Sequence, residues 1–364
     1  MRAPRLDLVV LGLSLSSSWG NGHATTFRAL LRGLHALGHR VLFLEREQPW
    51  YAANRDLGAP DFCALEFYDS VVDLAAQHAH AIRAADAVIV GSYVPDGVAV
   101  IDAVQALAPG RVSFYDIDTP VTLARLARGD CAYIAPRQIP VLATYFSFTG
   151  GPTLDRLQDQ YGARRAAALY CSVEPEHYRH TGAAPRWDLG YLGTYSVDRQ
   201  PTLERLLLAP ARRLPQRRFV VAGAQYPDDI DWPANVQRIA HLPPAEHPDF
   251  YSAQRFTLNV TRADMIAAGW SPSVRLFEAA AIGTPIISDA WEGLEALLPG
   301  GIAIARTTEE VVALLDAPED ASHQAMARRA RDIVLRQHTG QARAGELAAS
   351  LRQAAARHTA AVGE

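Results

Sequence analysis

Short apolar segments alternate with longer segments of helical periodicity along the whole chain. In the first half, the apolar segments predict strands at 6–13, 40–45, 86–91, 111–116, 143–148 and 167–171. The periodic segments between them predict helices at 24–37, 71–84, 97–108 and 120–128, the last with Thr119 as its cap and Pro120 at its first position. Parallel strands joined by crossover helices have this order, so the pattern predicts an α/β fold.

The same alternation begins again after a cluster of turn-forming residues at 180–187. Strands are predicted at 188–193, 218–223, 236–239, 255–260, 285–288 and 302–304, and helices at 201–209, 247–254, 273–282 and 308–316. The tail from 318 to 361 predicts two alanine-rich helices separated at Gly340. We therefore expect two α/β domains in series, with a ligand cleft between them.

The composition narrows the class of protein. A chain of 364 residues with 49% hydrophobic and 20% charged residues is typical of a globular enzyme with two domains. Its formal net charge of -4 gives no electrostatic reason to expect nucleic acid as the main partner. The three cysteines are far apart and odd in number, which favours a reducing compartment and a cytoplasmic location. Asp7 interrupts the first apolar run, which is too short for a transmembrane segment and is expected to be a buried strand.

A glycine-containing loop, Gly20-Asn21-Gly22-His23, joins the first predicted strand to the first predicted helix. Such a loop directs backbone amides and the positive end of the helix dipole toward an anion. Glu45, at the end of the second strand, has the position of the ribose-binding acid of dinucleotide folds. However, Thr25 or Thr26 replaces the third glycine of that fingerprint, so an NAD-binding domain is an alternative that the motif meets only in part.

His23 is the residue of this loop that is best suited to chemistry. An imidazole can take a proton from an attacking hydroxyl near neutral pH. The segment FYDIDTP ends the fourth strand with Asp116 and Asp118, and the carboxyl ends of parallel strands meet at one edge of the sheet. Either carboxylate would fix the tautomer of His23. Alternatively, His23 caps its helix or hydrogen-bonds the loop, and Asp118 helps to cap the helix that begins at Thr119.

The most informative stretch of the second half is SPSVRLFEAAAIGTPIISD, residues 271–289. Ser271 and Pro272 start a helix, so the free amides of Ser273, Val274 and Arg275 can hold a phosphate, with the Arg275 guanidinium as a second contact. Glu278 follows about one turn later, where it can accept hydrogen bonds from both hydroxyls of a ribose. An unpaired carboxylate in this apolar helix would be costly, so Glu278 is expected to have such a ligand.

The run 271–289 resembles the nucleotide-sugar motif of GT-B glycosyltransferases, in which a glutamate at the position of Glu278 binds the donor ribose. Segments between about residue 6 and residue 300 resemble more closely the CgeB-like (spore-maturation protein) glycosyltransferase family. These segments are SSSWGNGHATTFRALL, FYDIDTPVTL, SFTGGPTL, LGYLGTYSVDRQPTLERLL, RFVVAGAQYP and FTLNVTRADMIAAGWSPSVRLFEAAA.

The resemblance implies two Rossmann-like domains with parallel sheets facing the cleft. Residues 1–185 are expected to form the acceptor-side domain, 186–335 the donor domain, and 336–364 a helix that packs back on the first domain. The resemblance also implies a donor with a UDP, GDP or dTDP group and neither an essential metal nor another cofactor. In the wider GT-B group a second glutamate precedes the ribose acid by eight residues, but here that position is Trp270. The sugar contact and the inverting or retaining outcome are therefore left open.

Further contacts follow from position along the predicted strands. Gly193 and Thr194 open the first strand-to-helix loop of the second domain, which suits a diphosphate, and Arg199 is near enough in sequence to neutralise it. Arg262 and Asp264 follow a strand end and would face the sugar or phosphate, or else form an internal salt bridge. The remaining loop candidates, on the acceptor side or facing the diphosphate, are Gly20, Gly22, Thr149, Gly150 and Gly151.

Together these residues favour glycosyl transfer from a nucleotide sugar to a hydroxyl of a glycan, a small molecule or a protein. The amides at 273–275, with Arg275, Arg199 and Arg262, would stabilise the leaving nucleoside diphosphate without a metal. His23, oriented by Asp116 or Asp118, would be the base that deprotonates the acceptor. A nucleotide-sugar epimerase of the same fold and a non-catalytic GT-B-like protein are the alternatives.

Overall fold

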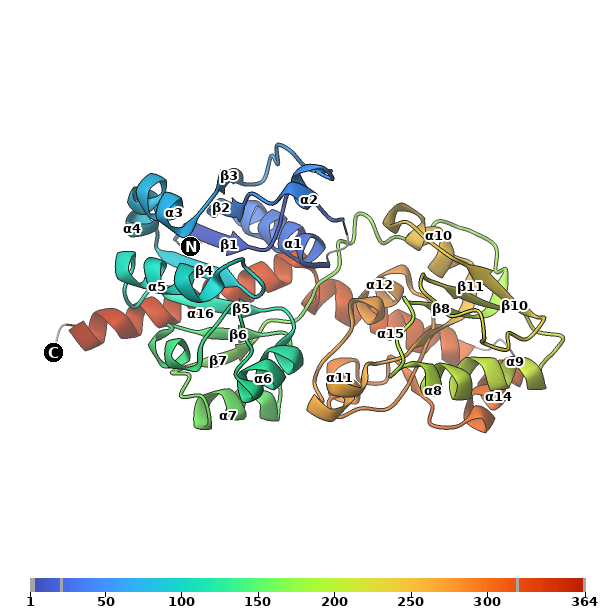
Figure 1. The fold of residues 1–364 in the computed structure, drawn as a ribbon. Helices are drawn as coiled ribbons and strands as arrows, with labels where there is room; N and C mark the ends of the chain where they lie inside the picture. Colours follow the sequence, from blue (N-terminus) through green and yellow to red (C-terminus); the bar gives the residue numbers. More distant parts are fainter. Residues whose placement is uncertain (1–3, 20–21, 319–320, 363–364) are drawn as a thin grey trace. The chain divides into compact units, whose positions relative to one another are not determined.

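The computed structural model describes residues 4–19, 22–318 and 321–362 and contains two compact units. The first unit comprises Met1–Ser172 and Thr339–Glu364, and the second comprises Val173–His338. Each unit is an α/β layer structure around its own parallel sheet (Figure 1). The boundaries differ from those expected at 185/186 and 335/336.

Contacts of the segment 173–186 explain the first difference. The amide of Val173 donates to His338 O at 3.0 Å, and the amide of Thr181 donates to Ser252 Oγ at 3.2 Å. The turn-forming residues at 180–187 therefore mark a loop inside the second unit. The second boundary moves because the His338 ring stacks on Phe277, with ring centroids 4.3 Å apart, and so stays with the second unit.

In the described part of the first unit, seven parallel strands form one sheet in the order β3-β2-β1-β4-β5-β6-β7. The strands are β1 (Asp7–Gly12), β2 (Arg40–Arg46), β3 (Ala64–Tyr68), β4 (Ala87–Gly91), β5 (Val112–Asp116), β6 (Tyr145–Ser147) and β7 (Ala166–Ala168). The sequence pattern missed β3, because this edge strand alternates exposed and partly buried residues and carries Glu66 in a segment of only five residues.

Helices cover both faces of this sheet (Figure 1). They are α1 (Gly22–Ala36), α2 (Pro49–Ala52), α3 (Val71–Gln77), α4 (Ala79–Ala84), α5 (Gly97–Leu107), α6 (Thr119–Arg128), the 3-10 helix η1 (Pro136–Val141), α7 (Pro152–Asp159) and α16 (Gly340–Val362). Alternate side chains of β1 divide the core: Val9 and Leu11 pack with the cluster around α5, whereas Leu8 and Val10 pack with that around α1 and α16. The predicted helix 71–84 is two helices, which meet at His78.

The C-terminal helix α16 packs along α1 and completes one face of the first unit. The two backbones approach closely where both sequences have glycine. A methyl group on Gly33 would lie 2.3 Å from Gly340 O, and one on Gly340 would lie 2.2 Å from Ala29 O. No larger residue fits at this crossing without moving one helix.

The second unit has a parallel sheet of six strands among its described residues, in the order β10-β9-β8-β11-β12-β13. The strands are β8 (Trp187–Leu192), β9 (Phe219–Ala222), β10 (Val236–Ile239), β11 (Gln254–Asn259), β12 (Ile286–Ser288) and β13 (Ala303–Ile304). Every strand of this sheet lies within a few residues of its predicted range. The apolar runs are easy to recognise because the central strands are buried on both faces.

The helical segments of the second unit are shorter and less regular. They are α8 (Gln200–Leu203), the π-helix η2 (Glu204–Leu208), α9 (Ala209–Arg213), the 3-10 helix η3 (Pro244–Glu246), α10 (His247–Ser252), α11 (Ala263–Ala268), α12 (Val274–Ile282), α13 (Leu294–Leu297), α14 (Thr308–Asp316) and α15 (Ala321–Gln337). None of the helices that the structure describes, in either unit, combines the length and hydrophobicity that crossing a bilayer requires.

Candidate functional site

The carboxyl edge of the second sheet gathers most of the predicted donor-binding residues. Gly193 and Thr194 follow β8, Arg262 follows β11, and Ser273 directly precedes α12. Ligands of parallel α/β sheets bind outside this edge, where the loops and helix N-termini are found. The sequence therefore brings these residues to the edge that suits a ligand.

The first turn of α12 is open to an anion. Ser273 is the residue before the helix, but its hydroxyl donates to Asn259 Oδ1 at 2.9 Å, and no side chain caps α12 among the described residues. The backbone amides of the first turn have no acceptor within a helix. With the positive end of the helix dipole, they form an anion-binding element. The Val274 side chain is exposed, so its part in binding can only be through its amide.

Two arginines beside this turn donate only to neutral acceptors among the described residues. Arg275 donates to Leu192 O and, at 3.0 Å, to Asn259 Oδ1. Arg199 donates to Thr194 O at 2.6 Å, and its buried Nε has no partner among the described residues. These acceptors are neutral, and neither arginine forms an ion pair within the described chain.

The environment of Arg199 is unfavourable to its own charge. Burial lowers the pKa of the Arg199 guanidinium, and the nearby charges of Arg275 and Arg262 lower it further. Gly193 lies beside the same group, since a methyl group on it would be 3.0 Å from Arg275 Nη2. An anion at this point would relieve the repulsion and supply the missing hydrogen-bond acceptors.

Asn259 and its neighbours hold Arg275 in place. The Asn259 amide, at the end of β11, donates to Thr261 Oγ1 at 3.1 Å and to Ser288 Oγ at 2.9 Å. Asp289 accepts from both the amide and the hydroxyl of Thr261 at 2.8 Å, and burial raises its pKa. This network joins β11, β12 and α12. The sequence indicated neither Asn259 nor Asp289, because polar residues that end strands are common and only their packing shows a network.

Glu278 is buried and already has two partners. Tyr178 Oη donates to its Oε1 at 2.7 Å, and Tyr251 Oη donates to its Oε2 at 3.0 Å. The argument that burial alone demands a ribose ligand was therefore wrong, because the tyrosines supply the required hydrogen bonds. Tyr178 is 100 residues before Glu278, so nothing local in the sequence indicated the contact.

Arg262 and Asp264 are both exposed, and no ion pair joins them. The alternative of an internal salt bridge between these two residues is therefore wrong. Arg262 precedes α11, and the amide of Ala263 donates to Asp198 Oδ2 at 3.0 Å. Burial opposes ionisation of Asp198, but hydrogen bonds from the Ser196 hydroxyl and the Ala263 amide, with the charge of Arg262 as a smaller contribution, lower its pKa.

In the first unit, His23 is the second residue of α1 and is half-buried. Its ring meets the ring of Tyr93 edge to face, with centroids 5.3 Å apart. Its Nδ1 is buried and has no hydrogen-bond partner among the described residues, and burial lowers the pKa of His23 to about 4. The imidazole is therefore neutral at pH 7. Gly22 starts α1 and is exposed, while Gly20 lies outside the described residues.

Asp116, one of the two carboxylates expected to orient His23, does not hydrogen-bond to it. Asp116 is fully buried and accepts from Tyr145 Oη at 2.6 Å and Thr122 Oγ1 at 2.7 Å, so it is bonded into the core rather than to His23. Burial raises the pKa of Asp116 to about 6.

Asp118 is linked to His23 through Tyr93, whose hydroxyl donates to Asp118 Oδ2 at 3.1 Å. Tyr93 follows β4 with a positive φ of 62°, which is unusual for an aromatic residue and is not visible in the sequence. Asp118 is also the residue before α6. Thr119, the predicted cap, is already helical, and its hydroxyl bonds Ser147 Oγ at 2.8 Å.

The loop after β1 is organised by Glu45. This buried carboxylate accepts from the amides of Leu15 and Ser16 at 2.6 and 2.9 Å, and from the hydroxyls of Ser14 and Ser16 at 2.9 and 2.7 Å. Both of its oxygens are directed at the loop. The NAD alternative loses its ribose-binding acid, since each oxygen of Glu45 already accepts two hydrogen bonds and the carboxylate offers only about four acceptor positions.

The other predicted glycine loop, Thr149-Gly150-Gly151, joins β6 to α7. Thr149 is buried, and its amide does not donate to a ligand because it donates to Ser147 Oγ at 3.0 Å. A methyl group on Gly150 would lie 2.0 Å from the hydroxyl of Tyr170. This loop is packed within the first unit, with Gly150 against the Tyr170 hydroxyl.

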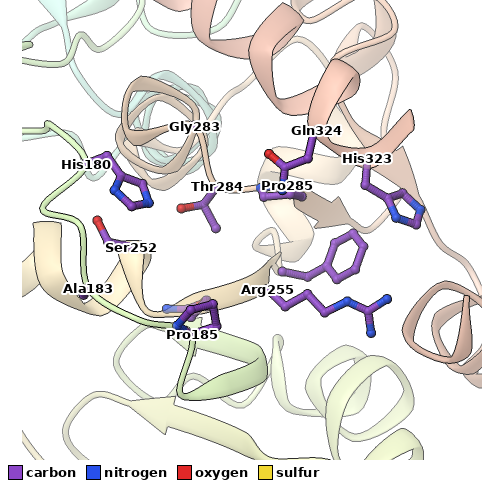
Figure 2. A pocket seen from close by; sticks show the side chains of 12 residues that line it. His180, Ala183, Pro185, Ser252, Arg255, Gly283, Thr284, Pro285, His323 and Gln324 are labelled. Carbon is purple, nitrogen blue, oxygen red and sulfur yellow. The ribbon is translucent and has the colours of Figure 1, made fainter. Parts of the chain in front are cut away.

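A pocket of about 230 Å³ lies at the opposite, amino edge of the second sheet (Figure 2). Its wall includes His180, Ser252, Thr284 and Arg255, and the Thr284 hydroxyl donates to Tyr251 O at 2.8 Å. The predicted donor residues do not line this pocket. Among the described residues, no group of His, Cys, Asp and Glu side chains is arranged to hold a metal ion.

A comparison with protein families finds a match that covers most of the second unit. Residues 199–349 match the family described as Glycosyl transferase-like, a range that begins at Arg199 and includes all of α12. The sequence of the whole chain matches none of the curated proteins.

Solved structures extend the likeness to almost the whole chain. Sucrose-phosphate synthase from Thermosynechococcus elongatus has a TM-score of 0.70 at 13% identity, covering 96% of this chain and 99% of that one. Anabaena HepE in complex with UDP has a TM-score of 0.68 at 12% identity, covering 96% and 100%. Trehalose-6-phosphate synthase OtsA has a TM-score of 0.66 at 12% identity, covering 95% and 99%. The chain therefore has the GT-B fold, which confirms the predicted fold class.

Proposed function

We propose that the protein is a glycosyltransferase that moves a sugar from a nucleoside diphosphate donor to an acceptor hydroxyl. The observation that carries this proposal is the pair of arginines, Arg199 and Arg275, which lack a carboxylate partner beside the uncapped first turn of α12. Half-buried positive charge of this kind favours an anion as a ligand. A diphosphate matches it in charge and in its number of acceptor oxygens.

The surrounding residues suggest how the donor binds. The diphosphate would lie between Gly193-Thr194 and the amides of Ser273, Val274 and Arg275, with Arg262 as a more exposed contact. Glu278 would accept from the ribose hydroxyls with the lone pairs that Tyr178 and Tyr251 leave over, since a carboxylate offers about four acceptor positions. HepE, a structural neighbour, binds UDP and UDP-glucose, which favours UDP among the three candidate nucleotides and a hexose as the sugar.

For the transfer step we propose His23 as the base. A base must be unprotonated before the reaction, and the lowered pKa of His23 keeps it so at neutral pH. Tyr93, which touches His23 and hydrogen-bonds Asp118, would hold the imidazole in place. The two guanidiniums and the helix amides would stabilise the leaving diphosphate without a metal ion. Asp116 would contribute by stabilising the core of the first unit through its bonds to Tyr145 and Thr122, and would not contact a substrate.

Two finer assignments belong to the same proposal. The motifs shared with the CgeB-like family favour membership of that group of GT-B enzymes. Cys63, Cys131 and Cys171 form no disulfide among the described residues, which agrees with the proposed cytoplasmic location.

Calorimetric titration with UDP, GDP and dTDP, each with and without EDTA, tests the donor site directly. One of them should bind wild-type protein in EDTA, and R275A should weaken that affinity about 10- to 100-fold, the usual loss for hydrogen bonds to a charged group. R213A is the matched control, because Arg213 is an exposed arginine of the same unit that pairs with Glu309. Equal affinity of wild type and R275A, or no binding of any of the three, would refute the proposal.

A further inference from the structure

Two loops interlock at the carboxyl edge of the second sheet. Trp270, between α11 and α12, has a φ of 45°, a left-handed conformation that few tryptophans adopt. Its amide donates to Glu292 O at 2.6 Å. Its half-buried ring packs on Gly293, where a methyl group would lie 2.4 Å from the ring. The left-handed backbone of Trp270 is thus held by the loop that follows β12.

The side chain of Glu292 lies at the same place. A methyl group on Gly269 would be 3.0 Å from Glu292 Cβ and 3.6 Å from its Oε2, so the carboxylate lies against the backbone directly before Trp270. Glu292 is exposed, and its carboxylate has no hydrogen bond or ion pair with the described residues. An acid without a partner is therefore held beside a partly exposed aromatic ring.

The covalent structure of a nucleotide sugar determines which part of the donor would contact the Trp270 ring and the Glu292 carboxylate. Trp270 is followed at once by Ser271-Pro272-Ser273, which leads into the first turn of α12. A sugar is bonded directly to the distal phosphate, so a diphosphate on that turn places its sugar next to the residues that precede the helix. An aromatic ring can cover the apolar face of a pyranose, and a carboxylate accepts hydrogen bonds from its hydroxyls.

We propose that Glu292 and Trp270 form the sugar subsite, with Glu292 accepting from hydroxyls of the donor sugar and the Trp270 ring covering its apolar face. This inference rests on the proposed function, because it needs the diphosphate at α12. It assigns the substrate class as a neutral pyranose with free hydroxyls. A sugar acid such as glucuronate is disfavoured, since its carboxylate would meet the charge of Glu292.

The ratio of two dissociation constants, that of the free nucleotide divided by that of its sugar conjugate, isolates the contribution of the sugar. Calorimetry on the full chain would measure this ratio for UDP with UDP-glucose, GDP with GDP-mannose and dTDP with dTDP-glucose. The variant is E292Q, which keeps the size of the side chain and removes its charge. The control is E176Q, because the Glu176 side chain is 93% exposed in the same unit.

For the nucleotide that binds, we expect E292Q to lower the ratio about tenfold and to leave the free nucleotide within about twofold of wild type. E292Q should also raise the ratio for UDP-glucuronate if UDP is that nucleotide. E176Q should change neither ratio. Thermal unfolding of E292Q at the wild-type temperature would show that the fold is intact, as expected for an exposed residue.

The outcomes separate this proposal from the one on which it rests. If a nucleotide binds but its ratio is the same in wild type and E292Q, or is near one for every wild-type pair, the sugar subsite is refuted and the donor site stands. If no nucleotide binds wild-type protein, both proposals fail.

Discussion

The most direct test of the donor site concerns Asn259, which touches no substrate in the proposed site. Its Oδ1 lies 3.0 Å from Arg275 Nη1 and 2.9 Å from Ser273 Oγ. Asn259→Asp changes the shape of this side chain very little but places a negative charge against the guanidinium. Arg275 would then have an internal anion, and an incoming diphosphate would have to compete with it.

The size of the effect follows from the geometry. Two unit charges about 4 Å apart interact by about 4 kcal/mol at an effective dielectric constant near 20. Screening by solvent and the remaining charge of Arg199 reduce the part that a ligand feels. We therefore expect the affinity for the nucleoside diphosphate to fall about 10- to 100-fold, which corresponds to about 1.4 to 2.8 kcal/mol.

Calorimetry with UDP and with uridine separates this effect from general damage, because uridine lacks the phosphates. N259D should weaken UDP and leave uridine unchanged, and the dependence of UDP affinity on salt should become shallower. Gln237→Glu is the control for added charge, since Gln237 is exposed on β10 and its Oε1, which accepts from Trp187 Nε1, is kept. Equal losses for UDP and uridine, or none for UDP, would show that Arg275 does not bind the diphosphate.

Two other predictions concern the first unit. Gly340→Ala should lower the free energy of unfolding by about 1–3 kcal/mol, because the new methyl group would lie 2.2 Å from Ala29 O. The control is Gly345→Ala in the same helix, which has open space around the new methyl group and should be neutral or stabilising. Equal denaturation midpoints for the two variants would contradict the packing argument. The pKa of His23 falls from 6.5 to about 4 on folding, so its effect on stability is absent above about pH 6.5, and protonation of the unfolded chain destabilises the protein as the pH falls toward 4. His23→Asn should therefore gain stability relative to wild type over that range, measured by urea unfolding at pH 7 and pH 4.5; a constant difference between the two proteins would refute the assignment.

The fold could be predicted from the sequence mainly where strands are buried on both faces. The run at 218–223 coincides with β9 because every residue of that strand is apolar and inaccessible. The strand at 64–68 was not predicted, because an edge strand needs only one apolar face and its sequence therefore lacks a continuous apolar run. The domain boundary at 185 was misplaced because turn-forming residues mark any loop, whether or not it joins two domains.

In the candidate site, too, some residues could be predicted from the sequence and others could not. Ser273, Arg275 and Arg199 could be proposed as donor-binding residues from local chemistry, since proline and serine mark a helix start and arginine suits phosphate. Their lack of carboxylate partners could be seen only in the structure. Tyr93 and Tyr178 could not be predicted, because the residues they touch are distant in sequence and a tyrosine alone indicates no function.

The first unit contains residues from both ends of the chain, so the order of synthesis determines when each unit can fold. Synthesis proceeds from the N-terminus, and the first unit lacks α16 until residues 340–362 have been translated. Until then α1 has one uncovered face, at Ala29, Leu30 and Gly33, while the second unit, which ends at His338, is already complete in sequence. The unit that is started first is therefore finished last, and translation that terminates before residue 340 would release a chain with a complete second unit and an uncovered apolar face on α1.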